Sequence, residues 1–547
     1  MNPSPPAPPP DPDLSDRMAA PEAGFLVEPE TRLSRSLLWE AQRRFFGRQG
    51  IDAWRRGIVP SYVTNNPALA QGYAAMVLGH MRDLRNEGAV WSAGAPATIL
   101  ELGAGGGRFA FLFLQAFEAL LAASPLAGTP FRYVMTDFAE ANIAFWRDHP
   151  ALAPFVAAGR LDFARFDAEG DDRATLLETG VTLGPDDAAT PLIVIANYVF
   201  DGLSQDAFAL RDGILMQTLV SLTADVPAAD LDDPDLLGRL QWHFTDHPLD
   251  EQPYAEPRFN RVLDAYRTGF PDGSLLFPSA ALRCIDRLAA MGGGRLLLLT
   301  GDRGEVHGAY LAGEPIPKFA MHGSFSLPVN YHAIGAWVHA RGGVGLTTSY
   351  RHGSLAVSAF LLGHDPAGLT ETRLAFDTTV EQGGPDDFFV LRQGLQPHYA
   401  TLEIRHLLAL LRLGGWDPKL VGDCAPALWD RLPEATDAHR AELVLALEQS
   451  WAHYYHLGEA QDLAFDFGML LYGLGAYEAA LARFSDSRRL YGDDARTRWN
   501  EGMCHAAAGR EAEAGRSLAA AFALDPGFAV PQALLGKQAE EDETLPA

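Results

Sequence analysis

A glycine-rich turn between a short strand and a long helix is the feature that most constrains this chain. The segment ATILELGAGGGRFAFLFLQAFEALLAA runs from Ala97 to Ala123. Its apolar start predicts a strand over Ala97–Leu102, and the apolar run from Arg108 predicts a helix. The turn between them contains Gly103, Gly105, Gly106 and Gly107. Glycines permit close backbone approach and a helix N-terminus presents free amides, so the segment predicts a nucleotide-like ligand.

The spacing of these glycines distinguishes two kinds of cofactor. A dinucleotide fingerprint places its third glycine three residues after the second, but Arg108 stands at that position here. Glu101, ahead of Gly103, completes instead the Glu-x-Gly-x-Gly-x-Gly pattern of an S-adenosylmethionine turn. A purely structural strand-to-helix turn is the alternative that this motif alone leaves open.

Polar side chains follow three further predicted strands. These are Phe131–Thr136 with Asp137, Arg160–Phe166 with Asp167, and Pro191–Ala196 with Asn197, Tyr198 and Asp201. Asp137 is placed to accept hydrogen bonds from both ribose hydroxyls, and Asp167 to meet an adenine amino group. Each acid taken alone is more often a solvated loop residue or a helix cap. The alternation of strands and helices predicts an α/β fold with a parallel sheet, whose ligand site lies beyond the carboxyl ends of its strands.

Three segments resemble the MidA-like family of class I methyltransferases, which comprises the mitochondrial complex I assembly type and its bacterial relatives. They are ELGAGGGRF, VMTDF and IVIANYVFDGLSQDAFALRDG. The resemblance covers about residues 30 to 365 and includes PDGSLLF, RLLLLTGDRGE and GSFSLPVNYHAIGAWV. It implies a Rossmann-like sheet with helices on both faces and S-adenosyl-L-methionine as the cofactor. The cofactor-binding residues that it implies are Glu101, Gly103, Gly105, Gly107, Asp137, Asp167 and Asn197.

The chain departs from this family near the substrate. The family's Asn-Glu is Asn197-Tyr198 here, and its Ala-Leu-Pro is Gly202-Leu203-Ser204. The family is associated with protein arginine methylation, and a guanidinium needs carboxylates to orient it because it stays protonated. The missing carboxylates argue against arginine as the methyl acceptor.

Asn197, Tyr198 and Asp201 are the catalytic candidates. Methyl transfer requires mainly that a nucleophile is held in line with the methyl–sulfur bond and that water is excluded. Asn197 would hold a target amine through its side-chain oxygen, Tyr198 would stack on it or face a cation, and Asp201 would orient the substrate or accept a proton. The structural alternative is that Tyr198 packs in the core and Asp201 caps the following segment.

A second pattern recurs near the C-terminus. Residues at a spacing of 34 correspond, namely Gly468, Gly475, Ala480 and Phe484 with Gly502, Gly509, Ala514 and Leu518. This is the tetratricopeptide (TPR) period, so we expect an all-α domain of TPR-like helical repeats. Grooves of stacked helices usually bind a peptide or protein segment, which predicts a protein partner. The alternatives are a dimer surface that gives a homodimer and a stabilising lid.

Composition argues against several classes of partner and ligand. The net charge is −27 and no Lys/Arg cluster of the kind that nucleic-acid readers carry appears, so we expect no nucleic-acid partner. The three cysteines lie far apart and the histidines form no His-Glu-x-x-His motif, so we expect no metal. The apolar stretch Phe109–Ala123 is too short to span a bilayer, and residues 1–22 have the composition of a proline-rich disordered tail. A cytoplasmic protein without a membrane segment is therefore expected.

The predicted domains are the tail at 1–22, a methyltransferase domain at 23–370, a helical linker or degenerate repeats at 371–457, and TPR repeats at 458–540. An insertion is expected within the methyltransferase domain at about residues 207–290. The predicted function is S-adenosylmethionine-dependent methylation of a protein recruited through the repeats. The alternative is a non-catalytic scaffold or assembly protein that keeps the cofactor fold. A nicotinamide dehydrogenase is disfavoured by Arg108.

Overall fold

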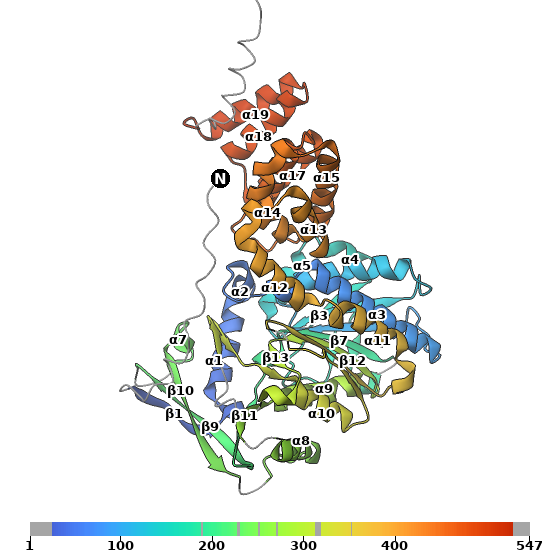
Figure 1. The fold of residues 1–547 in the computed structure, drawn as a ribbon, viewed down its shortest axis with the longest axis vertical. Coiled ribbons are helices and arrows are strands. Elements are labelled where there is room, and N and C mark those ends of the chain that lie inside the picture. Colours follow the sequence, from blue (N-terminus) through green and yellow to red (C-terminus); the bar gives the residue numbers. More distant parts are fainter. Residues whose placement is uncertain are drawn as a thin grey trace, which may run out of the picture. The chain divides into compact units, whose positions relative to one another are not determined.

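The computed structural model describes residues 24–187, 190–226, 230–249, 252–269, 272–311, 319–351 and 353–528. The chain divides into two compact units, the first ending at Leu391 and the second beginning at Arg392 (Figure 1). The predicted tail at 1–22 and the last part of the predicted repeats lie outside the described residues. No helix in the described parts of the chain combines the length and apolar character needed to cross a membrane.

A seven-stranded sheet forms the centre of the first unit. Its strands are β2 (Ala97–Leu102), β3 (Phe131–Asp137), β4 (Leu161–Arg165), β7 (Leu192–Asn197), β12 (Leu296–Asp302), β17 (Val344–Leu346) and β18 (Ala356–Leu362). They are ordered β4-β3-β2-β7-β12-β18-β17, and β18 is antiparallel to both of its neighbours. Numbered along the chain within this sheet, the order is 3-2-1-4-5-7-6, which is the class I methyltransferase arrangement. The predicted α/β fold class is confirmed, and the strand order reverses between β2 and β7, where such sheets bind ligands.

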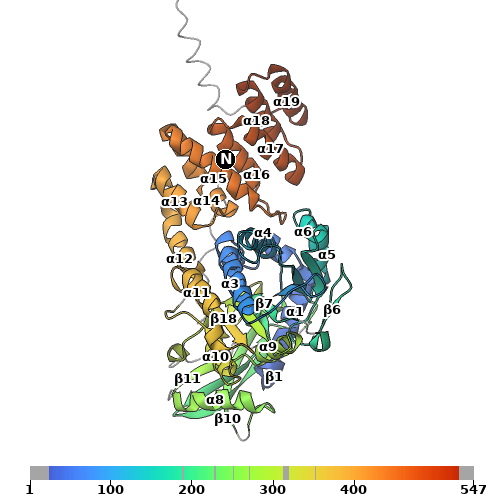
Figure 2. The ribbon, with the colours of Figure 1, turned by 90° about the vertical axis from the view of Figure 1, so that its right-hand side faces the viewer.

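Helices cover both faces of this sheet. The larger ones are α3 (Pro67–Asn86), α4 (Arg108–Ala122), α5 (Glu140–Asp148), α9 (Ser279–Met291), α10 (Tyr331–His339) and α11 (Thr370–Phe376). Figures 1 and 2 show α3 and α4 on one face and α9 and α10 on the other. Leu100, Val194 and Leu298 are fully buried against the face that α9 and α10 cover. Every residue of β2 and β12 is buried, as expected for strands that are enclosed on both faces.

A second, antiparallel sheet lies below the first in both of these views. It contains β1 (Phe25–Arg32), β8 (Asp206–Arg211), β9 (Ile214–Ala224), β10 (Leu240–Pro248) and β11 (Gly273–Phe277), with α8 (Pro257–Gly269) following β10 in the chain. Most of these elements fall within the predicted insertion. β1 comes from the start of the described chain and pairs with β9, a long-range pairing that the sequence did not indicate.

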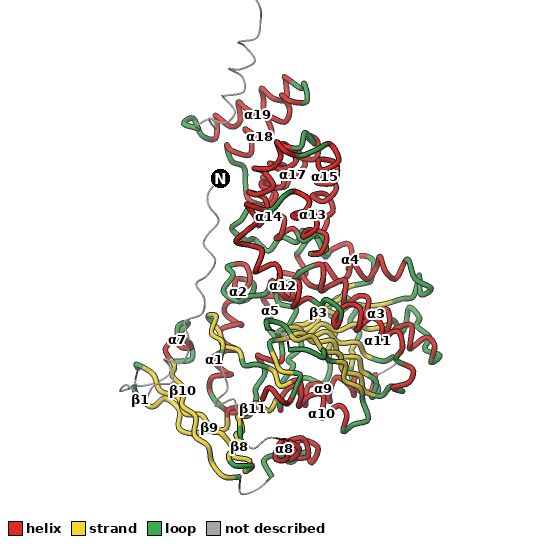
Figure 3. The backbone as a smooth tube through the Cα atoms, viewed as in Figure 1, coloured by secondary structure: helices red, strands yellow, loops and turns green. Residues whose placement is uncertain are grey.

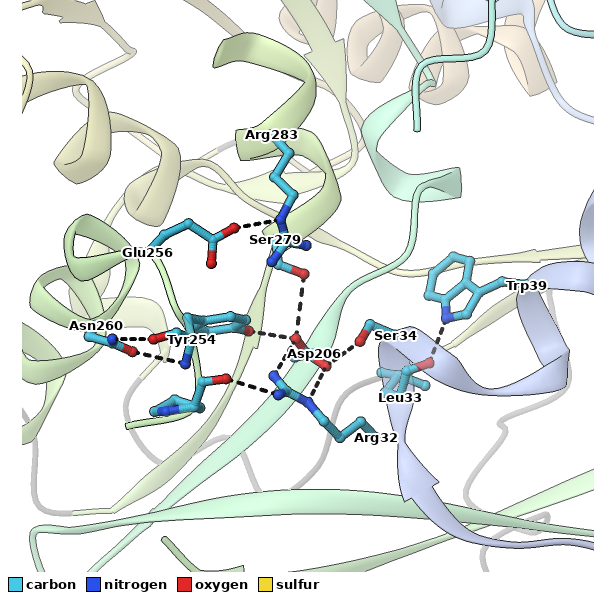
Figure 4. A network of polar contacts seen from close by, with 11 residues as sticks. Arg32, Leu33, Ser34, Trp39, Asp206, Tyr254, Glu256, Asn260, Ser279 and Arg283 are labelled. Carbon is cyan, nitrogen blue, oxygen red and sulfur yellow. Dashed lines mark hydrogen bonds and ion pairs between the residues drawn. The ribbon is translucent and has the colours of Figure 1, made fainter. Parts of the chain in front are cut away.

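The buried carboxylate of Asp206 ties this second sheet to the segment after β1 (Figure 4). Arg32 forms an ion pair with it at 2.8 Å, and the hydroxyls of Ser34 and Tyr254 each donate to it at 2.6 Å. Ser279 at the start of α9 donates to it at 3.4 Å. A buried charge that is paired and hydrogen bonded in this way fixes the relative position of its four partners.

Two N-terminal helices, α1 (Leu37–Gln49) and α2 (Asp52–Arg55), follow this anchor. The Ser36 side chain caps α1 by accepting from the N–H of Leu38. Further along α1, the Gln42 side chain donates from Nε2 to the carbonyl of Phe325 at 2.6 Å. Gly50 ends α1 with a φ of 48°, and a Cβ there would lie 3.2 Å from Ala141 of α5. Contacts to the rest of the first unit therefore anchor α1 along its length.

The smaller elements of the first unit complete its loops. They are α6 (Ala153–Ala157), α7 (Leu236–Arg239), β5 (Ala174–Thr175), β6 (Thr182–Leu183), β13 (Gly304–Glu305), β14 (Ala320–His322), β15 (Ser324–Ser326) and β16 (Val329–Asn330).

The second unit is all-helical in its described part (Figure 3). Its helices are α13 (Ile404–Leu413), α14 (Pro418–Arg431), α15 (Asp437–Ala452), α16 (Leu463–Gly473), α17 (Tyr477–Tyr491), α18 (Ala495–Ala507) and α19 (Glu511–Leu524), and α12 (Pro385–Leu395) runs across the division between the units.

The residues that correspond at the 34-residue spacing take equivalent positions in two helix pairs. A Cβ on Gly468 of α16 would lie 2.6 Å from Phe484 of α17, and a Cβ on Gly502 of α18 would lie 2.7 Å from Leu518 of α19. The glycines of the two interhelical turns, Gly475 and Gly509, have φ values of 78° and 73°.

Candidate functional site

The glycine turn lies at the carboxyl end of β2, beside the point where the sheet order reverses. Gly103, Gly105 and Gly107 have φ values of 57°, 52° and 78°, in a region that residues with a side chain rarely adopt. The turn is held from α5, because Nε1 of Trp146 donates to the carbonyl of Gly105 at 2.9 Å. The predicted turn therefore has the left-handed backbone conformation that glycine adopts most readily.

A tryptophan of the N-terminal helices lies directly against this turn. A Cβ on Gly105 would come within 2.8 Å of Cζ2 of Trp54, on α2. The Trp54 ring stacks on Phe46 of α1, with 6.3 Å between ring centroids and 25° between planes. Gly105 is thus required for the contact that α2 makes with the turn.

Glu101 lies at the end of β2 and is 5% exposed. The hydroxyl of Tyr133 donates to its Oε2 at 3.0 Å. Burial raises the pKa of Glu101 to about 8; the Tyr133 hydrogen bond opposes this rise, and the charge of Asp137 adds to it. At neutral pH this carboxyl group is therefore largely protonated and can donate a hydrogen bond.

Asp137 ends β3 and is also buried. Its Oδ1 accepts from the N–H of Ala139 and its Oδ2 from Nδ2 of Asn142, both at 2.9 Å. It also accepts from the backbone N–H of Gly105, so it connects β3 to the glycine turn. Burial raises its pKa despite these hydrogen bonds. With the backbone N–H of Phe138 it has four donors, so a ribose hydroxyl would bind here by sharing or replacing one of them.

Asp167 follows β4 and is bound by an arginine of α1. Arg43 donates from Nη1 to Oδ1 of Asp167 at 3.1 Å and from Nη2 to Oδ2 at 2.5 Å. Its guanidinium carbon also lies 4.9 Å from the centroid of the Phe138 ring. Burial alone would raise the pKa of Asp167, but the hydrogen bonds and charge of Arg43 lower it. The carboxylate predicted to meet an adenine amino group is therefore engaged by a guanidinium.

Asn197, the last residue of β7, is held by α3. The hydroxyl of Tyr73 donates to Oδ1 of Asn197 at 2.8 Å. A Cβ on Gly301 of β12 would lie 3.0 Å from each of these two oxygens, so the close packing requires glycine there. Among the described residues, Nδ2 of Asn197 is a buried donor without a hydrogen-bond partner. An unsatisfied buried donor is costly, and a bound ligand is one way in which it is satisfied.

Tyr198 has a left-handed backbone conformation with a φ of 51°. Its N–H donates to the carbonyl of Gly301 at 2.9 Å. The next residue, Val199, lies 3.1 Å from a Cβ built on Gly103, which brings this loop against the glycine turn. A strained conformation at a bulky residue, held here beside β12 and the glycine turn, is typical of functional sites.

Asp201 and Asp302 form a close pair of carboxyl groups. The N–H of Asp201 donates to Oδ2 of Asp302 at 3.1 Å, and the two side chains are hydrogen bonded to each other. Burial raises the pKa of Asp201 to about 6, opposed by hydrogen bonds from Ser326 and Asp302. Burial and the charge of Asp201 raise the pKa of Asp302 well above its usual range. Of the two carboxyl groups, Asp302 therefore holds a proton more tightly, and Asp201 is the one that ionises first.

The structure gathers the predicted residues into two groups. Glu101, the glycines and Asp137 are connected around the turn at β2 and β3, and Asn197, Tyr198 and Asp201 lie at the ends of β7 and β12. Asp167 lies beside the first group, because the N–H of the preceding Phe166 donates to the carbonyl of Asp137 at 3.0 Å, but its carboxylate is engaged by Arg43.

Sequence reasoning missed four participants, namely Arg43, Trp54, Tyr73 and Asp302. Asp302 carried a signal, because it lies within the segment RLLLLTGDRGE that the resemblance includes. The other three precede the glycine turn in the chain, and nothing local to them indicates the site.

The described residues contain no group of three His, Cys, Asp or Glu side chains arranged to hold a metal ion. The cysteines Cys284, Cys424 and Cys504 are buried and free.

Comparison with known proteins gives structural matches alone. No protein-family model matches the chain, and no curated protein matches it. An uncharacterized protein from Burkholderia thailandensis matches with 16% identity and a TM-score of 0.34, over 58% of this chain and 74% of that one.

Two further matches are described as methyltransferases. A candidate methyl transferase from Burkholderia thailandensis, bound to S-adenosylhomocysteine, matches with 17% identity and a TM-score of 0.33, over 57% of this chain and 79% of that one. Magnesium protoporphyrin IX methyltransferase from Synechocystis PCC 6803, with the same ligand, matches with 12% identity and a TM-score of 0.26, over 58% of this chain and 97% of that one. The fold of the present chain is assigned from its own strand order.

Proposed function

We propose that this protein is an S-adenosyl-L-methionine-dependent methyltransferase. One observation carries the proposal: a glycine turn and a buried carboxylate, Asp137, meet at the carboxyl ends of β2 and β3 in a sheet of order 3-2-1-4-5-7-6. The turn allows close backbone approach, and the carboxylate of Asp137 is the kind of acceptor that ribose hydroxyls bind. When bound, the cofactor supplies a methyl group that its sulfonium already activates.

The residues at the ends of β7 and β12 fit the acceptor side of such a reaction. The buried Nδ2 of Asn197 is an unsatisfied donor that can bind an acceptor atom of a ligand beside the reacting group, and the strained Tyr198 backbone fixes the loop that faces the glycine turn. Asp201 ionises more readily than Asp302 and keeps some exposed surface, so it can take a proton from an acceptor, while its hydrogen bonds to Asp302 hold it in place. The acceptor that this group suits is a nitrogen that loses a proton on methylation.

We further propose that the acceptor belongs to a protein recruited by the TPR-like helices of the second unit. The support is the equivalence of the glycine contacts in α16–α17 and α18–α19, since stacked helix pairs of this kind present surfaces for peptides. Binding energy from a remote surface positions an acceptor and therefore raises the rate.

Cofactor binding is the first test of this proposal. S-Adenosylhomocysteine should bind the full chain with micromolar affinity, about 8 kcal/mol, and NAD should not bind. Titration calorimetry measures both, and binding of NAD without a response to S-adenosylhomocysteine would overturn the assignment.

Transfer is tested with labelled cofactor and a lysate of the source cell. The full chain should label a protein, and a chain that ends at Leu391 should keep cofactor binding but lose that labelling. Equal labelling by the two chains would contradict recruitment through the second unit.

A non-catalytic scaffold is the second candidate. The observation that favours it is that Arg43 and Trp54 contact positions expected to serve the cofactor. A scaffold predicts capture of a protein partner with no transfer of label by the full chain, and no cofactor affinity in any variant of α1 or α2.

A further inference from the structure

Side chains of α1 and α2 contact the parts of the site expected to hold adenosine. Arg43 is bonded to both oxygens of Asp167 and lies over Phe138, the residue next to Asp137. Trp54 lies against Gly105 in the turn. The contacts reach the ends of three neighbouring strands, β2, β3 and β4.

A guanidinium can replace an adenine at such a position. Both are planar, both stack on an aromatic ring, and both donate hydrogen bonds to a carboxylate. The guanidinium adds a positive charge and a two-point contact, which makes its hydrogen bonds to Asp167 the stronger ones. Oδ1 of Asp167 accepts from Arg43 and from the N–H of Glu169, Oδ2 accepts from Arg43, and Arg43 covers one face of Phe138, so an adenine at this position competes with Arg43 for Asp167 and Phe138.

The local structure allows this exchange without unfolding α1. The Arg43 side chain is 37% exposed, so it can turn toward solvent, whereas Gln42 beside it is buried and bonded to Phe325. α2 is four residues long and lies between Gly50 and Gly57, whose φ values are 48° and 66°. A short helix between two such glycines can move Trp54 away from the turn by changes at its ends.

We propose that α1 and α2 gate the cofactor site, with Arg43 occupying the adenine position and Trp54 covering the glycine turn until the cofactor displaces them. This inference rests on the proposed function and concerns the regulation of the same site. The affinity observed for the cofactor is then its intrinsic affinity reduced by the fraction of molecules in which the gate is open.

The test is titration calorimetry of S-adenosylhomocysteine into the full chain and three variants. Arg43→Ala should bind about tenfold more tightly than wild type, since a half-exposed ion pair and a cation–π contact no longer compete. Trp54→Ala should also tighten binding. The matched control is Arg44→Ala, which removes the same charge from the next position of α1, where Arg44 pairs with Glu40 and Asp232.

The measured affinities distinguish the gate from a cofactor-binding role of Arg43 and from failure of the proposed function. Tighter binding by Arg43→Ala with unchanged binding by Arg44→Ala supports the gate. Unchanged or weaker binding by Arg43→Ala overturns it, and weaker binding would make Arg43 a cofactor-binding residue while the proposed function stands. If wild type and every variant melt as folded proteins but none binds, the proposed function itself fails.

A second variant keeps the test decisive if Arg43→Ala does not fold. Arg43→Lys retains the charge but gives up the planar two-point contact, so it should tighten binding by less than Arg43→Ala. Equal affinity in Arg43→Lys and wild type would then overturn the gate.

Discussion

The hydroxyl of Tyr133 donates a hydrogen bond to Oε2 of Glu101 at 3.0 Å, at the point where β2 meets the glycine turn. The pair is buried, and burial raises the pKa of Glu101 from an ordinary value of 4.5 to about 8. A carboxyl group with a raised pKa stabilises the folded state fully below its ordinary pKa, and this stability is lost as the pH rises through the folded value. Glu101 therefore favours folding in mildly acidic solution.

The first prediction concerns this pH dependence. Glu101→Gln keeps an acceptor for Tyr133 but cannot ionise, so its melting temperature should fall less than that of wild type between about pH 5 and about pH 8. Thermal melts at both values measure the difference. Glu118→Gln, at a site that is 37% exposed, controls for the change of net charge. An identical pH dependence in Glu101→Gln and wild type would show that Glu101 is ionised in the folded protein.

The second prediction concerns the proton of the Asp201–Asp302 pair. Because Asp302 is 0% exposed and lies beside a second carboxyl group, wild type should show a protonated carboxyl group at neutral pH that Asp302→Asn lacks. Difference infrared spectroscopy distinguishes a protonated carboxyl from a carboxylate. Asp232→Asn, with a side chain that is 80% exposed, should leave the protonated band unchanged. Because Glu101 contributes a protonated band of its own, both proteins are compared in a Glu101→Gln background, where a band that persists in Asp302→Asn would assign the proton elsewhere.

The parts of the fold and site that local sequence patterns specify could be predicted, whereas contacts between residues far apart in the chain could not. The strand Ala97–Leu102 has the predicted bounds, the strand that ends at Asp137 is one residue longer than predicted, and the strand that ends at Asn197 is shifted by one residue at both ends. The agreement is close because apolar runs and turns are local signals. The Arg43–Asp167 pair joins residues 124 positions apart, and neither residue carries a motif that points to the other. Tertiary packing decides such contacts, and it also imposes the left-handed backbone of Tyr198, which no propensity predicts.

The third prediction tests the ribose contact. Asp137→Ala should weaken binding of S-adenosylhomocysteine at least about tenfold, since charge-assisted hydrogen bonds are lost. It should also destabilise the fold by about 1–3 kcal/mol, because the donors on Ala139 and Asn142 lose their acceptor. Calorimetry and thermal melts separate the two effects, with Asp148→Ala at an exposed site of α5 as the control. Full affinity in Asp137→Ala would place the ribose elsewhere.

The fourth prediction concerns the packing of Trp54 on the glycine turn. Gly105→Ala adds a Cβ within 2.8 Å of Trp54 at a φ of 52°. It should therefore destabilise the fold in two ways, by straining the backbone and by displacing the indole ring of Trp54. Gly128→Ala, at a φ of 80° with nothing within 4 Å, should cost the strain alone, about 1–2 kcal/mol. In a Trp54→Ala background the excess cost of Gly105→Ala should disappear. An excess that persists there would mean that the Cβ meets a different neighbour.

The last prediction concerns the helix pairs of the second unit. Gly468→Ala and Gly502→Ala each place a Cβ within 3 Å of a large side chain, Phe484 and Leu518 respectively, so both should push their helix pair apart and destabilise it. Overpacking of this kind costs about 1–3 kcal/mol, which outweighs the gain from replacing a helical glycine by alanine. Gly515→Ala, in α19 with nothing within 4 Å of its Cβ, should instead stabilise the unit by about 0.5–1 kcal/mol. Hydrogen exchange across α16–α19 localises each effect. Similar destabilisation by the first two variants would show that the 34-residue spacing marks structurally equivalent contacts, whereas stabilisation by either would show that its helix pair is loosely packed.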